Sequence, residues 1–185
     1  GQGPWTHVDF DAVFERITRK NTRDERNVLT ISAQHGLVSQ LDYFSKSVAS
    51  EDLRSYTPLT TGDFAYNKSS SSGYPVGAIK PLLAYDSGVV SSLYICFRSR
   101  PGVEVDTDFY RLYFEAGMLN DAITGIAQEG ARSHGLLNIS VRDFFKLPLH
   151  LPPLEVQRRV AAILRVAEAE ERSIGRQREA LLTEK

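Results

Sequence analysis

The sequence lacks the features that define several protein classes. Cys96 is the only cysteine, so no disulfide can form within the chain, and a reducing cytoplasm is the expected location. No segment approaches the roughly 18 consecutive apolar residues that a membrane span requires. Residues 1–5 have neither the basic start nor the apolar stretch of a signal peptide, and they lack an initiator Met, which suggests an excised fragment.

Motifs that carry catalysis are also missing. The four histidines show no pairing at metal-ligand spacing, and no serine lies in a Gly-x-Ser-x-Gly turn. Residues 73–77 have spaced glycines but lack the Lys-Ser/Thr ending of a phosphate-binding loop, and there is no glycine-rich methyl-donor loop. Cys96 alternates with apolar residues, as a small core residue would. These absences together predict a protein without catalysis, cofactor or metal.

Charge gives no simple signature of a nucleic-acid binder. Lys and Arg number 22 against 23 Asp and Glu, a net charge of −1, whereas a strongly basic domain is the usual sign of nucleic-acid binding. Binding to DNA would therefore depend on local basic patches or on a partner that supplies most phosphate contacts.

The chain changes character at residues 151–153, Leu-Pro-Pro. Upstream, apolar spacing predicts helices over 11–20 and 108–120, and a capping box at Ser140 predicts another helix start. Alternating or apolar runs predict strands over 27–32, 37–39, 64–66 and 91–98. This irregular mixture predicts an α+β fold: a compact domain over 1–152 with a twisted sheet and short helices, and then a long helix over 153–185.

The C-terminal segment has the residues of a helix that needs a partner. Pro153 suits a first helical turn, and no later proline interrupts the segment. Isolated helices are marginally stable in water, and the apolar stripe here is too narrow for a self-sufficient zipper. We therefore expect a docking surface along the residues of this stripe: Val160, Ile163, Leu164, Ala167, Ile174 and Leu181.

Polar loops offer the only candidate binding groups. Asn67, Lys68 and the serines that follow supply amide, ammonium and hydroxyl groups, and no acidic residue occurs between Asp63 and Asp86. Such groups can bond base edges and phosphates, although a plain surface loop has the same composition. A second candidate is the segment 132–134, where Arg132 could equally pair with Glu129. The third is the pair Gln34 and His35 before Gly36.

The segment 147–164 closely resembles the junction in specificity subunits of type I restriction–modification enzymes. In that family a target-recognition domain ends in a Pro-Pro-Leu segment, followed by Gln and later by Ile and Leu, which opens a long helix. Pro152, Pro153, Leu154, Gln157 and residues 162–164 match, whereas Val156 replaces the usual Glu. Residues 62–69 and 88–94 resemble two upstream strands of the family, and residues 131–137 resemble the segment before its last short helix.

The resemblance implies a non-catalytic reader of double-stranded DNA that directs adenine methylation and restriction to a split site. Methyltransferase and restriction/motor subunits would be its partners, and the chain would be half of a longer subunit or a half-length subunit that forms a homodimer through the helix. The alternatives are a recognition domain of a single-chain restriction–methylation enzyme and a helical adaptor that does not bind DNA. The predicted DNA-contacting residues are Gln34, His35, Asn67, Lys68, Ser69, Ser70, Tyr74, Lys80, Arg132, Ser133 and His134.

Overall fold

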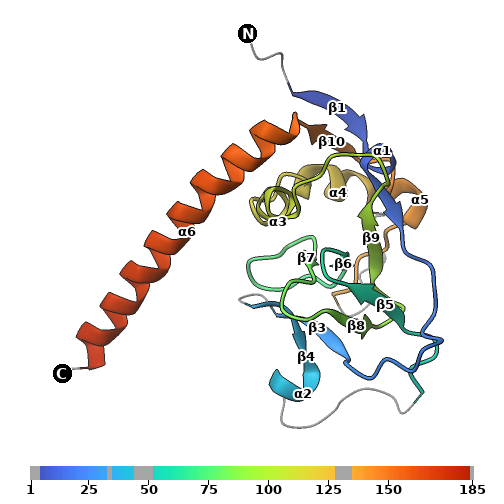
Figure 1. The fold of residues 1–185 in the computed structure, drawn as a ribbon, viewed down its shortest axis with the longest axis horizontal. Coiled ribbons are helices and arrows are strands. Elements are labelled where there is room, and N and C mark those ends of the chain that lie inside the picture. Colours follow the sequence, from blue (N-terminus) through green and yellow to red (C-terminus); the bar gives the residue numbers. More distant parts are fainter. Residues whose placement is uncertain (1–4, 33–34, 44–51, 128–134, 184–185) are drawn as a thin grey trace.

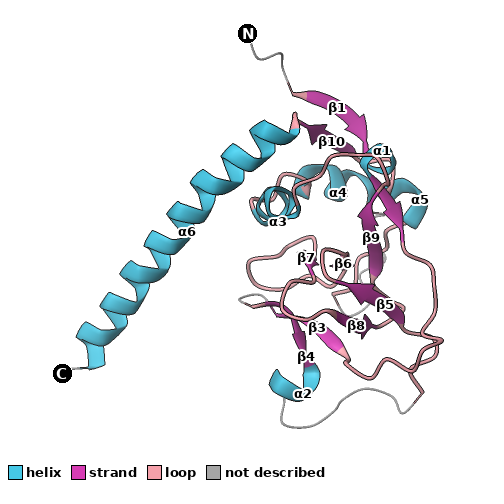
Figure 2. Ribbon diagram, viewed as in Figure 1, coloured by secondary structure: helices cyan, strands magenta, loops and turns pink. Residues whose placement is uncertain are grey.

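The computed structural model describes residues 5–32, 35–43, 52–127 and 135–183. They form a mixed domain of short strands and helices followed by one long helix (Figures 1 and 2), which is the α+β fold expected from the sequence. The strands are β1 (Thr6–Asp9), β2 (Phe14–Arg16), β3 (Leu29–Ser32), β4 (Gly36–Ser39), β5 (Thr57–Thr60), β6 (Phe64–Asn67), β7 (Ala78–Pro81), β8 (Ser87–Val90), β9 (Ile95–Ser99) and β10 (Pro148–Leu151). The helices are α1 (Phe10–Val13), α2 (Gln40–Tyr43), α3 (Thr107–Glu115), α4 (Asn120–Ile126), α5 (Val141–Phe144) and α6 (Leu154–Thr183).

An antiparallel sheet in the order β2-β9-β6-β7 forms the centre of the domain. Phe64 on β6 lies opposite both Phe97 on β9 and Pro81 on β7. Two-stranded pairs β3–β4 and β5–β8 complete the lower half of the domain as Figure 1 shows it. The strands have three to five residues each, so the sheet is held by packing across its faces as much as by its own ladders.

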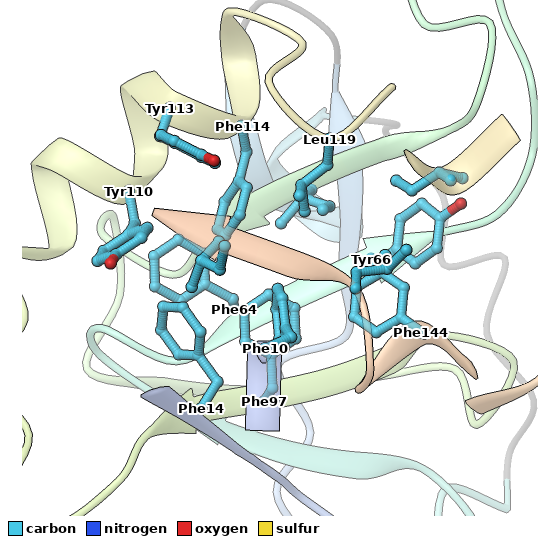
Figure 3. Close-up of a cluster of buried hydrophobic side chains, with 14 of the residues drawn as sticks. Phe10, Phe14, Phe64, Tyr66, Phe97, Tyr110, Tyr113, Phe114, Leu119 and Phe144 are labelled. Carbon is cyan, nitrogen blue, oxygen red and sulfur yellow. The ribbon is translucent and has the colours of Figure 1, made fainter. Parts of the chain in front are cut away.

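Aromatic side chains make up nearly half of the main core cluster, 11 of its 23 buried residues. Rings from α1, β2, β6, β9, α3 and α5 meet in one cluster (Figure 3). Phe64 and Phe97 stack with their centroids 5.3 Å apart, and Tyr66 stacks on Phe144 at 5.0 Å. Aromatic pairs at these distances contribute roughly 0.5–1.5 kcal/mol each beyond their buried area. Cys96 is buried in a second, aliphatic cluster, and burial raises the pKa of its thiol to about 12, so it behaves as a core residue.

The strand pair β1–β10 joins the beginning of the chain to the start of the long helix. Thr6 lies opposite Leu151, and His7 lies opposite His150 with the ring centroids 4.1 Å apart. The Tyr113 hydroxyl on α3 is 2.7 Å from Nδ1 of His150. Burial lowers the pKa of His150, and the charge of His7 lowers it further.

Helix α6 has 30 residues, which corresponds to roughly 45 Å at 1.5 Å per residue. Its first turns pack on the domain, where Gln157 and Ala161 are fully buried, and its C-terminal end stands clear of the domain (Figure 1). None of the helices among the described residues is long and apolar enough to cross a membrane.

Two of the sequence-based element assignments were wrong. The helix predicted over 11–20 ends at Val13, because residues 14–16 instead pair with β9, with Phe14 opposite Ser99. The strand predicted over 91–98 begins only at Ile95. Residues 91–94 form a turn closed by the Tyr94 amide on the Ser91 carbonyl, and Leu93 is 67% exposed.

The helix predicted over 108–120 is divided into α3 and α4. The backbone of Gly117 has a φ of +73°, a conformation that ends the first helix and that other residues rarely adopt. The predicted start at Ser140 is confirmed, because its hydroxyl accepts a hydrogen bond from the Asp143 amide at the start of α5.

Candidate nucleic-acid interface

One end of the central sheet brings several polar loops together. Strand β6 ends at Asn67, β7 begins at Ala78 opposite it, and β9 begins at Ile95 opposite Tyr66. The connection 68–77 and the turn 91–94 therefore leave the sheet at the same end. The Asn67 amide nitrogen donates to the Tyr94 hydroxyl at 3.4 Å, which links the two.

A third segment joins this end of the sheet from far along the chain. The backbone amide and the hydroxyl of Ser70 both donate to the Gly135 carbonyl, at 2.9 and 3.1 Å. The Leu137 amide donates to the Lys68 carbonyl at 3.1 Å, and Ser69 forms a bridge with Leu136. The tertiary structure thus places the Asn67–Ser70 candidates directly beside the residues that follow 132–134. Arg132, Ser133 and His134 themselves lie outside the described residues.

The connection 68–77 is exposed at its tip and tightly held at its base. Ser69–Gly73 are exposed, while the Tyr66 hydroxyl beneath them donates to the Val76 carbonyl at 2.6 Å. Gly77 has a φ of +85°, and a Cβ there would lie 2.2 Å from the Asn67 carbonyl oxygen. Only glycine lets the two ends of the connection approach this closely. The exposed serines are therefore presented from a defined base.

The Asn67 side chain is largely engaged within the protein. Its carbonyl oxygen accepts the Ser69 amide at 3.1 Å, while its nitrogen bonds Tyr94. These contacts make Asn67 an organiser of the loops as well as a candidate for base contact. Tyr94 and the exposed Leu93 lie at the same sheet end but were not among the sequence-based candidates, because residues 91–98 were read as a single strand.

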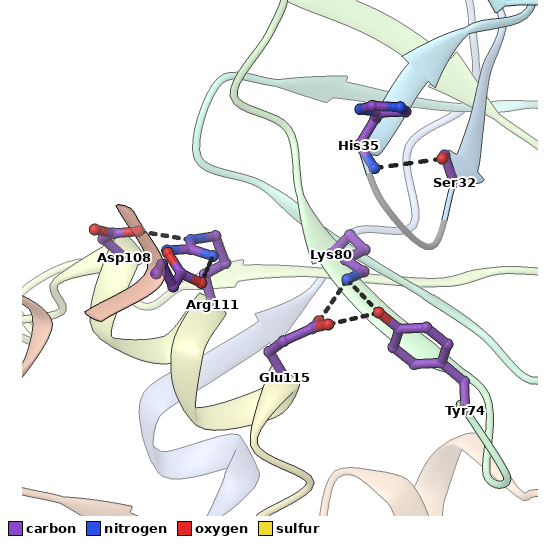
Figure 4. Close-up of polar contacts among 8 residues, drawn as sticks. Ser32, His35, Tyr74, Lys80, Asp108, Arg111 and Glu115 are labelled. Carbon is purple, nitrogen blue, oxygen red and sulfur yellow. Dashed lines mark hydrogen bonds and ion pairs between the residues drawn. The ribbon is translucent and has the colours of Figure 1, made fainter. Parts of the chain in front are cut away.

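Tyr74 and Lys80 contact α3 through Glu115 (Figure 4). The Tyr74 hydroxyl donates to Glu115 Oε1 at 2.5 Å, the Lys80 ammonium donates to the Tyr74 hydroxyl at 2.9 Å, and Lys80 forms an ion pair with Glu115. The side chain of Lys80 is only 8% exposed. Burial, followed by the bond to Glu115, raises the pKa of Tyr74. Both side chains therefore support the loop from behind through their contacts with Glu115.

His35 lies at a second location, the tip of the β3–β4 hairpin, and Gln34 lies outside the described residues. The His35 amide donates to the Ser32 hydroxyl at 3.3 Å. His35 also lines a cleft of about 340 Å³ between the domain and α6, together with Lys80, Arg111 and Arg172. The sequence could not separate this hairpin from the loops at the end of the central sheet.

The acidic residues Asp106, just before α3, and Asp108 and Glu115, within it, each make a separate contact. Asp106 caps the helix by accepting the Phe109 amide at 2.8 Å, Asp108 pairs with Arg111, and Glu115 pairs with Lys80. Among the described residues there is no group of three or more His, Cys, Asp or Glu side chains that could hold a metal ion.

The apolar stripe of α6 is largely exposed. Val160 is half-buried against the core, whereas Ile163 is 68% exposed, Ile174 is 55% exposed, and Leu164 and Ala167 are also exposed. Leu181 belongs to the helix, but its side chain lies outside the described part. The described part of the chain thus leaves the stripe uncovered.

Contacts that sequence reasoning missed hold α6 to the domain. The Gln157 side-chain oxygen accepts the Asp106 amide at 2.8 Å, and its nitrogen donates to the carbonyls of Glu104 and Pro152 at 3.1 and 2.8 Å. One turn further on, Ala161 is buried in the core. Gln157 stood in the family-like segment, but nothing in the sequence indicated that it would be buried.

Comparison with solved structures finds the same fold in type I specificity subunits. The S subunit from M. genitalium matches 90% of this chain with a TM-score of 0.55 and 13% identity. The HsdS subunit from Thermoanaerobacter tengcongensis matches 95% with a TM-score of 0.55 and 17% identity. A chain from a structure concerned with assembly and conformational transition of the type I restriction–modification system matches 95%, with a TM-score of 0.54 and 16% identity.

The match covers nearly all of this chain but only part of each neighbour. This chain spans 39–42% of the length of those three chains. No protein-family model matches the sequence, and no curated protein matches it either. The likeness therefore lies in the fold: a mixed domain followed by a long helix, as in the specificity subunits.

Proposed function

We propose that this chain is one DNA-recognition unit of a type I restriction–modification specificity subunit, or a half-length subunit. The observation that carries the proposal is the fold match over 90–95% of the chain. The unit reads one half of a split target in duplex DNA and directs adenine methylation and restriction there. Catalysis would reside in methyltransferase and restriction/motor subunits, in the cytoplasm.

The loops at the end of the central sheet support this function. Exposed hydroxyls of Ser69 and Ser70, the Lys68 ammonium and the Asn67 amide can reach base edges and phosphates. Arg132, Ser133 and His134 precede Gly135, which bonds Ser70. We propose these seven residues as the DNA-contacting set, with 1–152 as the recognition domain and 153–185 as the docking helix.

The experiment that tests recognition is selection of bound duplexes from a random-sequence pool. The full chain is assayed with and without a methyltransferase subunit. We expect sequence-selective binding with that subunit or with a homodimer, and loss of selectivity in the Asn67→Ala/Lys68→Ala/Arg132→Ala variant. The control Arg54→Ala/Lys146→Ala removes two other exposed cations, which pair with Asp52 and with Asp9 and Asp11. Retained selectivity in the triple variant would overturn the site assignment.

The exposed stripe of α6 supports docking onto a partner. Aspartate at a buried apolar contact is unfavourable, so Ile163→Asp/Ile174→Asp should abolish co-purification with the methyltransferase subunit. Both side chains are more than half exposed, so the variant should keep the fold of the chain. Ala169→Asp, at an exposed position on the opposite face of the same helix, is the matched control. Normal co-purification of the double variant would overturn the docking role of the stripe. A chain that binds partners but not DNA would favour the helical-adaptor alternative.

A further inference from the structure

A cavity of about 420 Å³ lies between the segment 19–25 and the β5–β8 pair, away from the loops described above. Arg19, Lys20 and Arg23 lie on its wall, and Thr60 and Ser87 line the opposite side. Among the described residues that line it, Glu25 is the only acidic one. Three cationic side chains thus face one carboxylate, in a chain whose net charge is −1.

The segment that carries these cations is fixed by its own hydrogen bonds. Asn21 is buried, and its side chain donates to the Glu25 carbonyl at 2.9 Å and accepts the Glu25 amide at 3.0 Å. The Asn21 amide donates to the Tyr56 carbonyl at 3.1 Å, which ties the segment to the residues before β5. Asp24, with a φ of 53°, is the only residue other than glycine with a positive φ among the described residues. The backbone of the wall is therefore defined before any ligand binds.

The negative charge of Glu25 is already used within the protein. Its carboxylate accepts the Ser87 hydroxyl at 2.5 Å and the Asn27 amide at 2.9 Å, and these bonds lower its pKa. Because both carboxylate oxygens accept internal hydrogen bonds, Glu25 is held in place on the Ser87 side of the cavity.

The cations differ in how they are engaged. Arg19 lies 3.6 Å from the buried Asp63 carboxylate, which Arg98 also contacts at 2.8 Å. Lys20 and Arg23 are exposed, and neither forms an ion pair with any residue in the described ranges. Their charges are available to an external anion. Lys and Arg donate several hydrogen bonds each, and phosphate is the anion that such groups commonly bind in proteins.

We propose that this cavity binds a phosphate group, and that the phosphate belongs to the DNA backbone. The second part rests on the proposed function. The β5–β8 pair runs from the cavity, at Thr60 and Ser87, to Thr57 and Val90, next to the turn 91–94. From Thr60 to Thr57 the strand advances three residues, which is roughly 10 Å. The major groove of DNA is about 12 Å wide and about 8.5 Å deep, so one domain can hold a phosphate here while its loops read bases.

The test is the salt dependence of binding to a duplex that contains the selected target, measured by fluorescence anisotropy. The protein is the full chain with its methyltransferase subunit, as wild type, as Lys20→Ala/Arg23→Ala, or as the matched control Arg54→Ala/Lys146→Ala, which removes two cations away from the cavity. Losing phosphate contacts should reduce the slope of log K against log[salt] by about 1–2, and weaken binding about tenfold at moderate salt without changing the target. The control should keep the wild-type slope.

The outcomes separate this inference from the proposed function. Absence of duplex binding by wild type would contradict the proposed function. Duplex binding with an unchanged slope in Lys20→Ala/Arg23→Ala would overturn the backbone-phosphate assignment. Calorimetric titration with inorganic pyrophosphate tests the cavity without DNA. Pyrophosphate binding that is lost in Lys20→Ala/Arg23→Ala and kept in the control supports a phosphate site. Equal pyrophosphate binding by wild type and this variant would overturn that site.

Discussion

The Arg111 guanidinium on α3 grips the Glu168 carboxylate on α6 through two hydrogen bonds, at 3.0 and 2.9 Å. Both side chains are less than one third exposed, and Arg111 also bonds Asp108 at 2.6 Å. The bond to Arg111 lowers the pKa of Glu168. Together with Gln157, this pair sets the direction in which the long helix leaves the domain.

Separating Arg111 from Glu168 should loosen the helix. We expect Arg111→Ala and Glu168→Ala each to lower the free energy of unfolding by about 1–2 kcal/mol, since charged hydrogen bonds of partly buried groups are lost. Amide hydrogen exchange in residues 160–170 should quicken. Arg165→Ala, which removes a more exposed contact to Asp108, is the control and should cost less. If the free energy of unfolding that Arg111→Ala/Glu168→Ala loses equals the sum of the two single losses, the two side chains do not stabilise the fold through each other.

Gln157 should be the most sensitive polar residue of α6. Gln157→Ala leaves the Asp106 amide and the Glu104 and Pro152 carbonyls without their partner and creates a cavity, so we expect a loss of about 2–4 kcal/mol. Urea unfolding measures it. Gln177→Ala, at an exposed position of the same helix, should change stability by less than about 0.5 kcal/mol. Similar values for the two variants would contradict the anchoring role of Gln157.

Gly77 and Gly73 provide a matched pair for the loop at the end of the central sheet. Both have a positive φ, but a Cβ at Gly73 meets nothing within 4 Å, whereas one at Gly77 meets the Asn67 carbonyl oxygen and the Tyr66 ring. Gly73→Ala should lower the free energy of unfolding by about 1–2 kcal/mol, because only backbone strain is added. Gly77→Ala should cost at least about 3 kcal/mol and should also impair DNA binding, because the base of the loop must shift. Thermal unfolding with a duplex-binding assay checks this, and equal losses would show that the close approach does not matter.

The pair His7 and His150 should make stability depend on pH below neutrality. Burial and the charge of His7 lower the pKa of His150, so the unfolded chain binds its proton more readily than the folded chain. The ordinary pKa of His is about 6.5, so the stability that comes from neutral His150 is fully present above that pH. It is lost as the pH falls from there through the lowered pKa of the folded state. We expect urea midpoints to fall between pH 7.5 and 5.5.

His150→Gln should flatten that pH dependence. His7→Gln should only reduce it, because the charge of His7 is the smaller of the two causes that lower the pKa of His150. His35→Gln, at the tip of the β3–β4 hairpin, is the control. A slope unchanged by His150→Gln would assign the pH dependence to other groups.

Local chemistry was enough to predict part of this structure. Pro153 begins a segment free of further proline, so the long helix after it followed from backbone preference, and its narrow apolar stripe indicated that a surface would be left uncovered. The Ser140 cap followed from residues within one turn. The family-like segment 147–164 pointed to the fold that the solved specificity subunits share.

Only the tertiary structure decided where the long-range partners lie. The apolar spacing of Val13, Phe14 and Ile17 fits a helix, but pairing with β9, some 80 residues away along the chain, made residues 14–16 a strand. Likewise no local pattern could bring Ser70 to Gly135, bury Gln157, or divide the candidates between the sheet end and the α6 cleft. Sequence determines conformations whose energy depends on neighbours along the chain. Packing and hydrogen bonding between distant segments decide the rest.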